Sequence, residues 1–185
     1  AIGLYSHTML GLELTQLDLP LKDNSKGGWK RYIIARGTTP NVGSMSVHAS
    51  TLAPGKSPHP PHNHLDEEIL MVLHGEADIV VCEDAAGTNT KVHRMKPGGL
   101  ALYAPYQFHT IVNNSDAAVN YLMFRWSGNP CHLGSPITQI IHNFSFSEPL
   151  GRRKKKAVRA QRIFKDQTHF LDALECHVTN LDAGG

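Results

Sequence analysis

The sequence predicts an all-β sandwich or barrel, and three observations lead to this prediction. Short apolar runs are separated by turn residues, chiefly Gly, Pro, Asn and Asp. About eight such runs occur between residues 29 and 126, at the spacing typical of β-sandwiches and barrels. No segment in that range keeps a helical period of 3.6 residues.

The expected strands follow one another along the first two thirds of the chain. They cover residues 29–36, 44–52, 68–73, 76–82, 91–95, 100–103, 108–112 and 119–126, and residues 136–142 are a further candidate. The segment 53–64 is different, because its four prolines exclude a helix interior or a central strand. Turns such as those at residues 84–89, 96–99 and 113–116 separate the strands.

Composition limits the classes of protein that the chain can represent. Of the 185 residues, 41% are hydrophobic and 18% are charged, which is typical of a globular domain. The net charge of +2 is too small to indicate a nucleic-acid partner, and no apolar run is long enough for a membrane span. The first ten residues lack the features of a signal peptide, so a soluble, cytoplasmic protein is favoured while the compartment stays open.

The histidines point to a metal site. Five of the twelve lie between His48 and His74. His62 and His64 are separated by one residue, so on an extended segment both imidazoles project to the same face. Glu68 can reach the same point through a tight turn, and His109 lies in a later predicted strand. Such nitrogen and oxygen ligands suit one divalent Fe, Mn, Ni, Cu or Zn ion, and four of them leave two octahedral positions open.

Two motifs carry a resemblance to a known family. They are Gly55-x6-His62-x-His64-x3-Glu68-x6-Gly75 and Gly99-x5-Pro105-x3-His109-x3-Asn113. Together they resemble the two motifs of the cupin superfamily. Two small departures, a longer spacing before His62 and Gln107 in place of a glycine, both fall in turns. The resemblance implies an antiparallel jelly-roll barrel, a double-stranded β-helix, with His62, His64, Glu68 and His109 holding the metal inside.

The resemblance also implies a range of functions. Dioxygenases are the largest relevant group, which would make the chain an oxidoreductase acting on a small oxygen-rich molecule chelated to the metal. Lyases, decarboxylases and sugar isomerases are the alternatives among enzymes, and a sugar-binding, effector-binding or storage protein is the non-catalytic alternative. Tyr103, Gln107 and Arg36 are candidate substrate-binding residues at the barrel mouth. No glycine-rich phosphate loop indicates a nucleotide cofactor.

The chain divides into four predicted segments. These are an N-terminal arm (1–28), the barrel (29–127), a connector with a basic run at 152–156 (128–156), and a C-terminal segment (157–185). In the last segment, residues 177–184 weakly repeat residues 48–55 at an offset of 129. We therefore expect the start of a second cupin barrel, as in a bicupin, or an arm that exchanges strands in a homodimer. If the repeat is accidental, the tail simply packs on the barrel.

Overall fold

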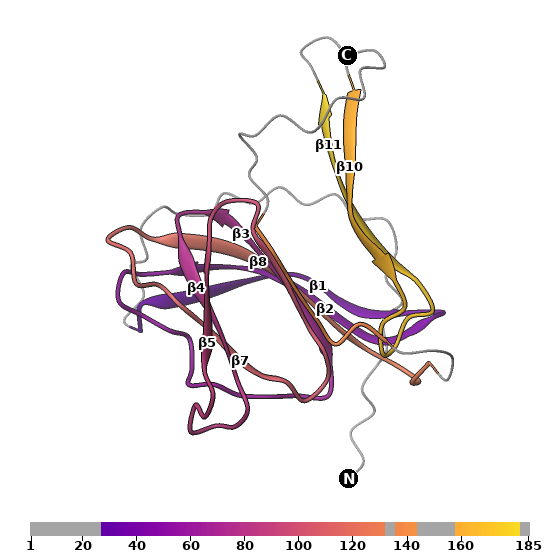
Figure 1. Cartoon of the computed structure of the whole chain (residues 1–185), viewed down its shortest axis with the longest axis horizontal. Coiled ribbons are helices and arrows are strands. Elements are labelled where there is room, and N and C mark those ends of the chain that lie inside the picture. The colour runs from indigo at the N-terminus through magenta and orange to yellow at the C-terminus, as the bar shows by residue number, and fades with distance from the viewer. Residues whose placement is uncertain (1–26, 132–135, 144–157, 182–185) are drawn as a thin grey trace.

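The computed structural model describes residues 27–131, 136–143 and 158–181, and every regular element in them is a β-strand (Figure 1). The strands are β1 (Trp29–Thr39), β2 (Val42–Leu52), β3 (Glu67–His74), β4 (Ala77–Cys82), β5 (Lys91–Met95), β6 (Leu100–Tyr103), β7 (Phe108–Val112), β8 (Val119–Ser127), β9 (Gln139–His142), β10 (Val158–Asp166) and β11 (Leu174–Leu181). The prediction of an all-β fold is confirmed. No helix in the described ranges is long and apolar enough to cross a membrane.

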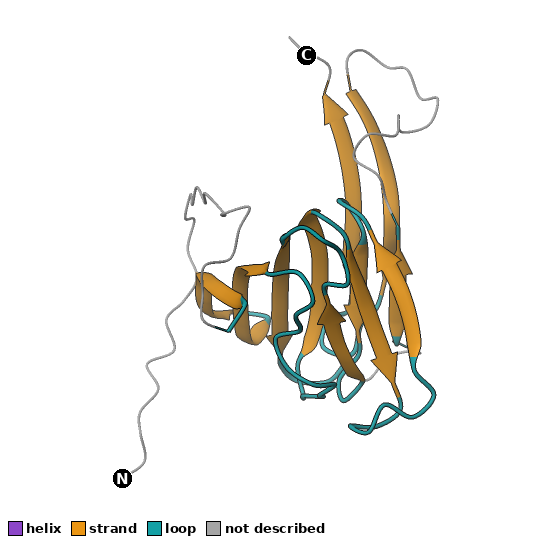
Figure 2. Ribbon diagram, turned by 90° about the vertical axis from the view of Figure 1, so that its left-hand side faces the viewer, coloured by secondary structure: helices purple, strands orange, loops and turns teal. Residues whose placement is uncertain are grey.

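Two antiparallel sheets form the barrel (Figure 2). One has six strands in the order β1-β2-β8-β3-β6-β9, and the other has three in the order β5-β4-β7. Because successive side chains on a strand point to opposite faces, each strand sends alternate residues between the sheets. The larger hydrophobic cluster collects residues from both sheets, including Leu52, Val72, Ile79, Tyr103 and Val119, all fully buried.

Gly75 makes the sharp connection between β3 and β4 possible. Its φ of 75° lies in the left-handed region, which residues with a side chain rarely adopt. A Cβ at this position would also lie 2.7 Å from the carbonyl oxygen of Ala118. The turn predicted at this glycine is therefore confirmed, and both conformation and space require glycine there.

The predicted connector takes part in the barrel. Residues 139–142 form β9, which pairs with β6 through contacts such as Tyr103 opposite Gln139. The basic run at 152–156 and nearly all of the predicted N-terminal arm lie outside the described residues.

The hairpin β10–β11 lies beside the barrel and extends beyond it (Figure 1). The loop between its strands packs on the outer face of the six-stranded sheet. Phe170, 5% exposed, joins Val42, Leu102 and Trp126 in a second hydrophobic cluster. The amide of Cys131 also donates a hydrogen bond to the carbonyl oxygen of His169 at 2.8 Å. The loop is thus held on the barrel, whereas within the described residues the strands of the hairpin pair only with each other.

Candidate metal centre

The loop between β2 and β3 carries the first two predicted ligands to the barrel interior. Its prolines keep it extended, and a backbone bridge at His62 fixes it to β7. There the amide of His62 donates to the carbonyl oxygen of His109 at 3.1 Å, and the amide of His109 donates to that of His62 at 3.0 Å. This backbone bridge brings together two residues that are 47 positions apart in the sequence.

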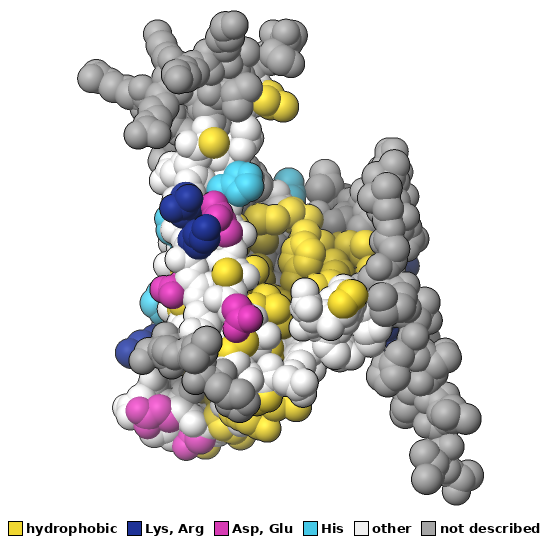
Figure 3. Space-filling view, turned by 90° about the vertical axis from the view of Figure 1, so that its right-hand side faces the viewer, with side chains coloured by type: hydrophobic (Ala, Val, Ile, Leu, Met, Phe, Trp, Pro, Cys, Tyr) yellow, Lys and Arg dark blue, Asp and Glu magenta, His cyan; other side chains and the backbone are white. Residues whose placement is uncertain are grey.

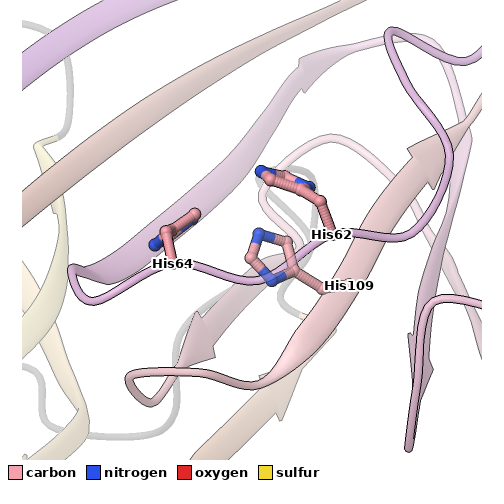
Figure 4. Close-up of side chains that lie close together, drawn as sticks. All are labelled: His62, His64 and His109. Atoms are coloured by element: carbon pink, nitrogen blue, oxygen red, sulfur yellow. The ribbon is translucent and has the colours of Figure 1, made fainter.

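Three imidazoles converge at this bridge (Figure 4). His62 and His64 come from the loop and His109 from β7, and each offers a ring nitrogen within 4.8 Å of the others. The ring centroids lie 4.9 to 5.3 Å apart. Three nitrogens at this spacing surround a point that one metal ion can occupy.

Glu68 lies beside two of the three rings. Its Oε2 is 3.2 Å from Nε2 of His64, and its Oε1 is 3.7 Å from Nε2 of His109. The residue is 4% exposed and is the second residue of β3, which begins at Glu67, one residue before the start that the sequence predicts. It does not belong to the set of donors that all lie within 4.8 Å of one another. The four-ligand assignment therefore stays a prediction, with Glu68 in place as the carboxylate neighbour of the triad.

The ring nitrogens that face the centre fit a metal ion. Nδ1 of His109 lies 2.8 Å from the carbonyl oxygen of Gln107, and Nδ1 of His64 lies 2.9 Å from that of Asp66. A carbonyl oxygen only accepts, so both Nδ1 atoms carry the hydrogen and each neutral ring keeps a lone pair on Nε2. Nε2 of His109 is buried without a hydrogen-bond partner. On His64 the lone pair faces a carboxylate oxygen, an arrangement that requires a proton or a cation between them.

The charges around the centre also suit a cation. Burial, and then the neighbouring histidine rings, lower the pKa of His62 to about 4, so this imidazole is neutral at pH 7. Burial alone would raise the pKa of Glu68, but the nearby histidine rings and then Arg125 outweigh it and hold that pKa well below its usual range. The site therefore combines a neutral imidazole at His62 with an ionised carboxylate at Glu68.

A cavity of about 190 Å³ opens onto the centre. Its walls include His62, Glu68 and His109, together with His48, His59 and Tyr121. Two arginines also line it. The guanidinium of Arg125 lies 3.1 Å from Glu68 Oε2, whereas that of Arg31 lies 6.0 Å from the ring of Trp29 on the exposed side of the wall. The cavity is smaller than pockets that hold drug-sized ligands, and it carries positive charge at its wall.

The structure places the three predicted substrate-binding residues away from this wall. Tyr103 is fully buried, and its ring stacks on that of His109 at 4.1 Å between centroids, so it packs behind a predicted ligand. Arg36 is exposed on β1, and neither it nor Gln107 lines the cavity. Sequence reasoning missed Arg31 and Arg125. For Arg31 the available signal was alternation on the strand, since it lies two residues after Trp29, which packs against the core and also lines the cavity.

Comparison with known proteins agrees with the fold. Residues 49–125 match the family model described as the cupin domain. A Pseudomonas aeruginosa protein named as glyoxylate induced has a similar structure, with 20% identity, a TM-score of 0.56, and coverage of 80% of this chain and 52% of that one. Protein Ylba from E. coli is also similar, with 16% identity, a TM-score of 0.50, and coverage of 67% and 48%. No curated protein matches the chain.

Fold and motifs together define the class: this is a β-barrel protein with a histidine cluster inside the barrel. Residues 49–125 form a cupin domain, as the family match shows, and the two similar structures share its fold. The chain spans about half the length of those two proteins. At these identities the structural likeness establishes the fold and leaves the activity to the site itself.

Proposed function

We propose that the protein is a metal-dependent oxidoreductase of the dioxygenase type that acts on a small anionic, oxygen-rich compound. The observation that carries the proposal is the convergence of three imidazoles and one carboxylate at the inner end of a small, positively lined cavity. His62, His64, His109 and Glu68 would hold one divalent transition metal. Such a metal supplies Lewis acidity and, when it is redox-active, electron transfer to dioxygen, the oxidant whose two oxygen atoms enter the product.

Contacts among residues around the centre hold the predicted ligands in position. Glu68 is ionised at neutral pH and paired with Arg125, so it serves as a ligand and not as a proton donor. Arg125 in turn is held by Glu68 and by Asp66, whose carboxylate lies 3.8 Å from its Nε. Tyr103 stacks on His109 and fixes the plane of that ring. These contacts hold the donors in place before a metal or substrate arrives.

Size and charge select the class of substrate. A volume of about 190 Å³ corresponds to roughly six water molecules, which limits the substrate to a small molecule. Because Arg125 is already compensated by two carboxylates, Arg31 is the cationic group best able to receive an anionic substituent. A small carboxylate or oxyacid therefore fits the cavity best.

Metal content tests the first half of the proposal. The protein would be purified without chelator and without nickel affinity resin, and its metals measured by mass spectrometry. We expect about one iron, manganese, nickel or copper ion per chain, and its loss in His64→Ala. His74→Ala is the matched control, because His74 is exposed at the end of β3 and should keep the metal. Absence of metal from the wild-type protein would overturn the proposal.

Oxygen consumption tests the second half. The loaded protein would be offered small hydroxy acids, keto acids and dicarboxylates under air, with dissolved oxygen recorded by electrode. Uptake that requires both an acid and the bound metal supports a dioxygenase. Stoichiometric zinc with no oxygen uptake would refute the redox assignment and indicate a lyase, decarboxylase, isomerase or binding protein instead.

A further inference from the structure

The hairpin β10–β11 repeats the pairing of the hairpin β1–β2. Residues 29–52 and 158–181 have the same length and align without a gap at a constant offset of 129 residues. Every residue pair of β10–β11 has its counterpart in β1–β2 at this offset. The pairs that open the two hairpins are Trp29 with Leu52 and Val158 with Leu181, and pairs further along are Tyr32 with Ala49 and Gln161 with Val178.

An irregularity in the pairing repeats at the same place. In β1–β2 the register shifts between Ile33 and Ala35, and in β10–β11 it shifts between Arg162 and Phe164, again 129 residues later. A β-bulge bends its strand and increases its twist, so its position sets the shape of a hairpin. The two hairpins therefore have the same shape and not merely the same length.

The turns of the two hairpins share a hydrogen bond. The Thr39 hydroxyl accepts a hydrogen bond from the amide of Val42 at 3.1 Å, and the Thr168 hydroxyl accepts one from the amide of Leu171 at 3.2 Å. These residues correspond at the same offset. Four of the aligned positions are identical, namely Ile34/Ile163, Thr39/Thr168, His48/His177 and Leu52/Leu181. The two hairpins thus share their register, their bulge and their turn hydrogen bond although few of their aligned residues are identical.

One face of β11 is exposed where the same face of β2 is buried. His48 and Leu52 of β2 point into the barrel and are 3% and 0% exposed. Their counterparts, His177 and Leu181, are exposed, and Leu181 reaches 67%. A face that forms a barrel wall in the first copy therefore lies open in the second.

One edge of β11 is also open. In the barrel, β2 pairs with β1 on one side and with β8 on the other, where Leu52 lies opposite Val119 and His48 opposite Met123. Among the described residues, β11 pairs with β10 alone. Native proteins normally cover or blunt such an edge, because its free amides and carbonyls recruit another strand.

An apolar groove of about 570 Å³ lies between the hairpin and the six-stranded sheet (Figure 3). Met71, Phe124 and Trp126 line it from the six-stranded sheet, and Ile163, Leu174 and Val178 line it from the hairpin. Residues 174–179 of β11, the strand with the open edge, line the groove. A sheet that grows from that edge would pass over the groove and cover it.

We propose that residues 158–181 are the first hairpin of a second cupin barrel. A strand of that barrel equivalent to β8 pairs with the open edge of β11, its interior covers the face of His177 and Leu181, and its sheet fills the apolar groove. The groove is then the interface between the first barrel and the second. The two barrels have the same fold, and their equivalent residues differ by 129 in number. This inference does not depend on the metal centre or its chemistry.

A fusion that completes the second barrel tests the proposal. A second copy of residues 53–127, which follow β1–β2 in the barrel, is joined directly after Leu181 of the otherwise full chain. Hydrogen exchange followed by mass spectrometry then compares the amides of residues 174–181 in the fusion and in the unaltered chain. We expect exchange in the fusion to be slower by about a hundredfold or more, because the new strand binds the open edge. Unchanged exchange would overturn the proposal.

Two variants separate barrel completion from non-specific contact. Met123→Pro in the appended copy alone removes the amide that would lie opposite His177, and the slowed exchange should be lost. Leu181→Lys should leave the unaltered chain unaffected, because Leu181 is exposed there, yet abolish the slowed exchange in the fusion, where this position would be core. If slowed exchange survives either substitution, β10–β11 is not a barrel wall and the proposal fails.

Discussion

Glu67 Oε2 accepts a hydrogen bond from the Thr168 hydroxyl at 2.7 Å, which joins β3 of the barrel to the loop before β11. The same carboxylate also accepts from Trp126 Nε1 at 2.9 Å and from the amide of His169 at 2.8 Å. Since neighbouring residues on a strand point to opposite faces, Glu67 holds the hairpin loop while Glu68 faces the metal centre. Two adjacent carboxylates thus serve two different parts of the molecule.

Removing the charge at Glu67 should loosen the hairpin loop. In Glu67→Gln, one acceptor oxygen becomes an NH₂ group that faces hydrogen-bond donors in a fully buried position. We expect the free energy of unfolding to fall by about 2–4 kcal/mol, since a buried donor left unpaired is costly. Urea unfolding monitored by tryptophan fluorescence measures this loss directly, because Trp126 is one of the donors.

Glu76→Gln is the matched control for this substitution. Glu76 has 41% of its side chain exposed and pairs with Arg94 on the surface, so its loss should change stability by less than about 1 kcal/mol. Equal effects of the two substitutions would mean that the Glu67 contacts add nothing to stability.

Metal binding should increase the free energy of unfolding, and the increase should require all three histidines of the triad. With a chelator-stripped protein, adding a divalent metal at about a hundred times its dissociation constant should add about 2.7 kcal/mol to the free energy of unfolding. His109→Ala should remove most of this gain, because it deletes one of the three converging nitrogens. His59→Ala should retain it, since His59 lies in the cavity wall but outside the triad. A gain that survives His109→Ala would place the metal elsewhere.

Arg31 should decide the affinity for anionic substrates. Arg31→Gln should raise KM for a small carboxylate about tenfold, or roughly 1.4 kcal/mol, with a smaller change in kcat, because the charge lies at the wall and not at the predicted ligands. Arg36→Gln is the matched control. Arg36 is the arginine that the sequence predicts for this task, yet it lies outside the cavity on the same strand. A larger effect from Arg36→Gln would favour the sequence prediction over the geometry.

The sequence predicts the strands and the histidine cluster well because both depend on local pattern. Turn residues bound the strands, and the alternate spacing of His62 and His64 already places their rings on one face. Long-range pairing is a different matter. On a regular strand Arg31 and Arg36, five residues apart, would lie on opposite faces, but the bulge between Ile33 and Ala35 reverses the alternation. Arg31 then lies opposite Ser50 and Arg36 opposite Ser46, on the same face, and it is Arg31 that lines the cavity. A bulge leaves no clear mark in a single sequence.

The position of Tyr103 is a second case in which the local sequence pattern does not predict a long-range contact. The sequence predicts Tyr103 as a substrate-binding residue at the barrel mouth, but its ring is fully buried, stacks on that of His109 and does not line the cavity. The contacts of Glu67 join residues about a hundred positions apart, so no local pattern could predict them. Such contacts depend on how the hairpin packs on the barrel, which periodicity alone does not specify.

His48 should make the protein less stable in mild acid. It is 3% exposed, and burial, followed by the charge on Arg31, lowers its pKa from 6.5 to about 4. Above pH 6.5 neither the folded nor the unfolded state holds this proton. As the pH falls from 6.5 toward 4, the unfolded state binds the proton first, so the free energy of unfolding decreases, by about 2 kcal/mol at pH 5.

Replacing His48 isolates this contribution from those of other groups. His62, whose pKa is also about 4, and Glu68, whose pKa is lowered, contribute acid sensitivity to both proteins alike. Between pH 7 and pH 5, His48→Gln should therefore lose stability about 2 kcal/mol less than the wild type does, because glutamine does not titrate. His74→Gln, at an exposed position, should follow the wild type. The free energy of unfolding would be measured by urea unfolding at half-unit pH steps. If it depends on pH in the same way for wild type and His48→Gln, His48 keeps its ordinary pKa in the folded barrel and the prediction is wrong.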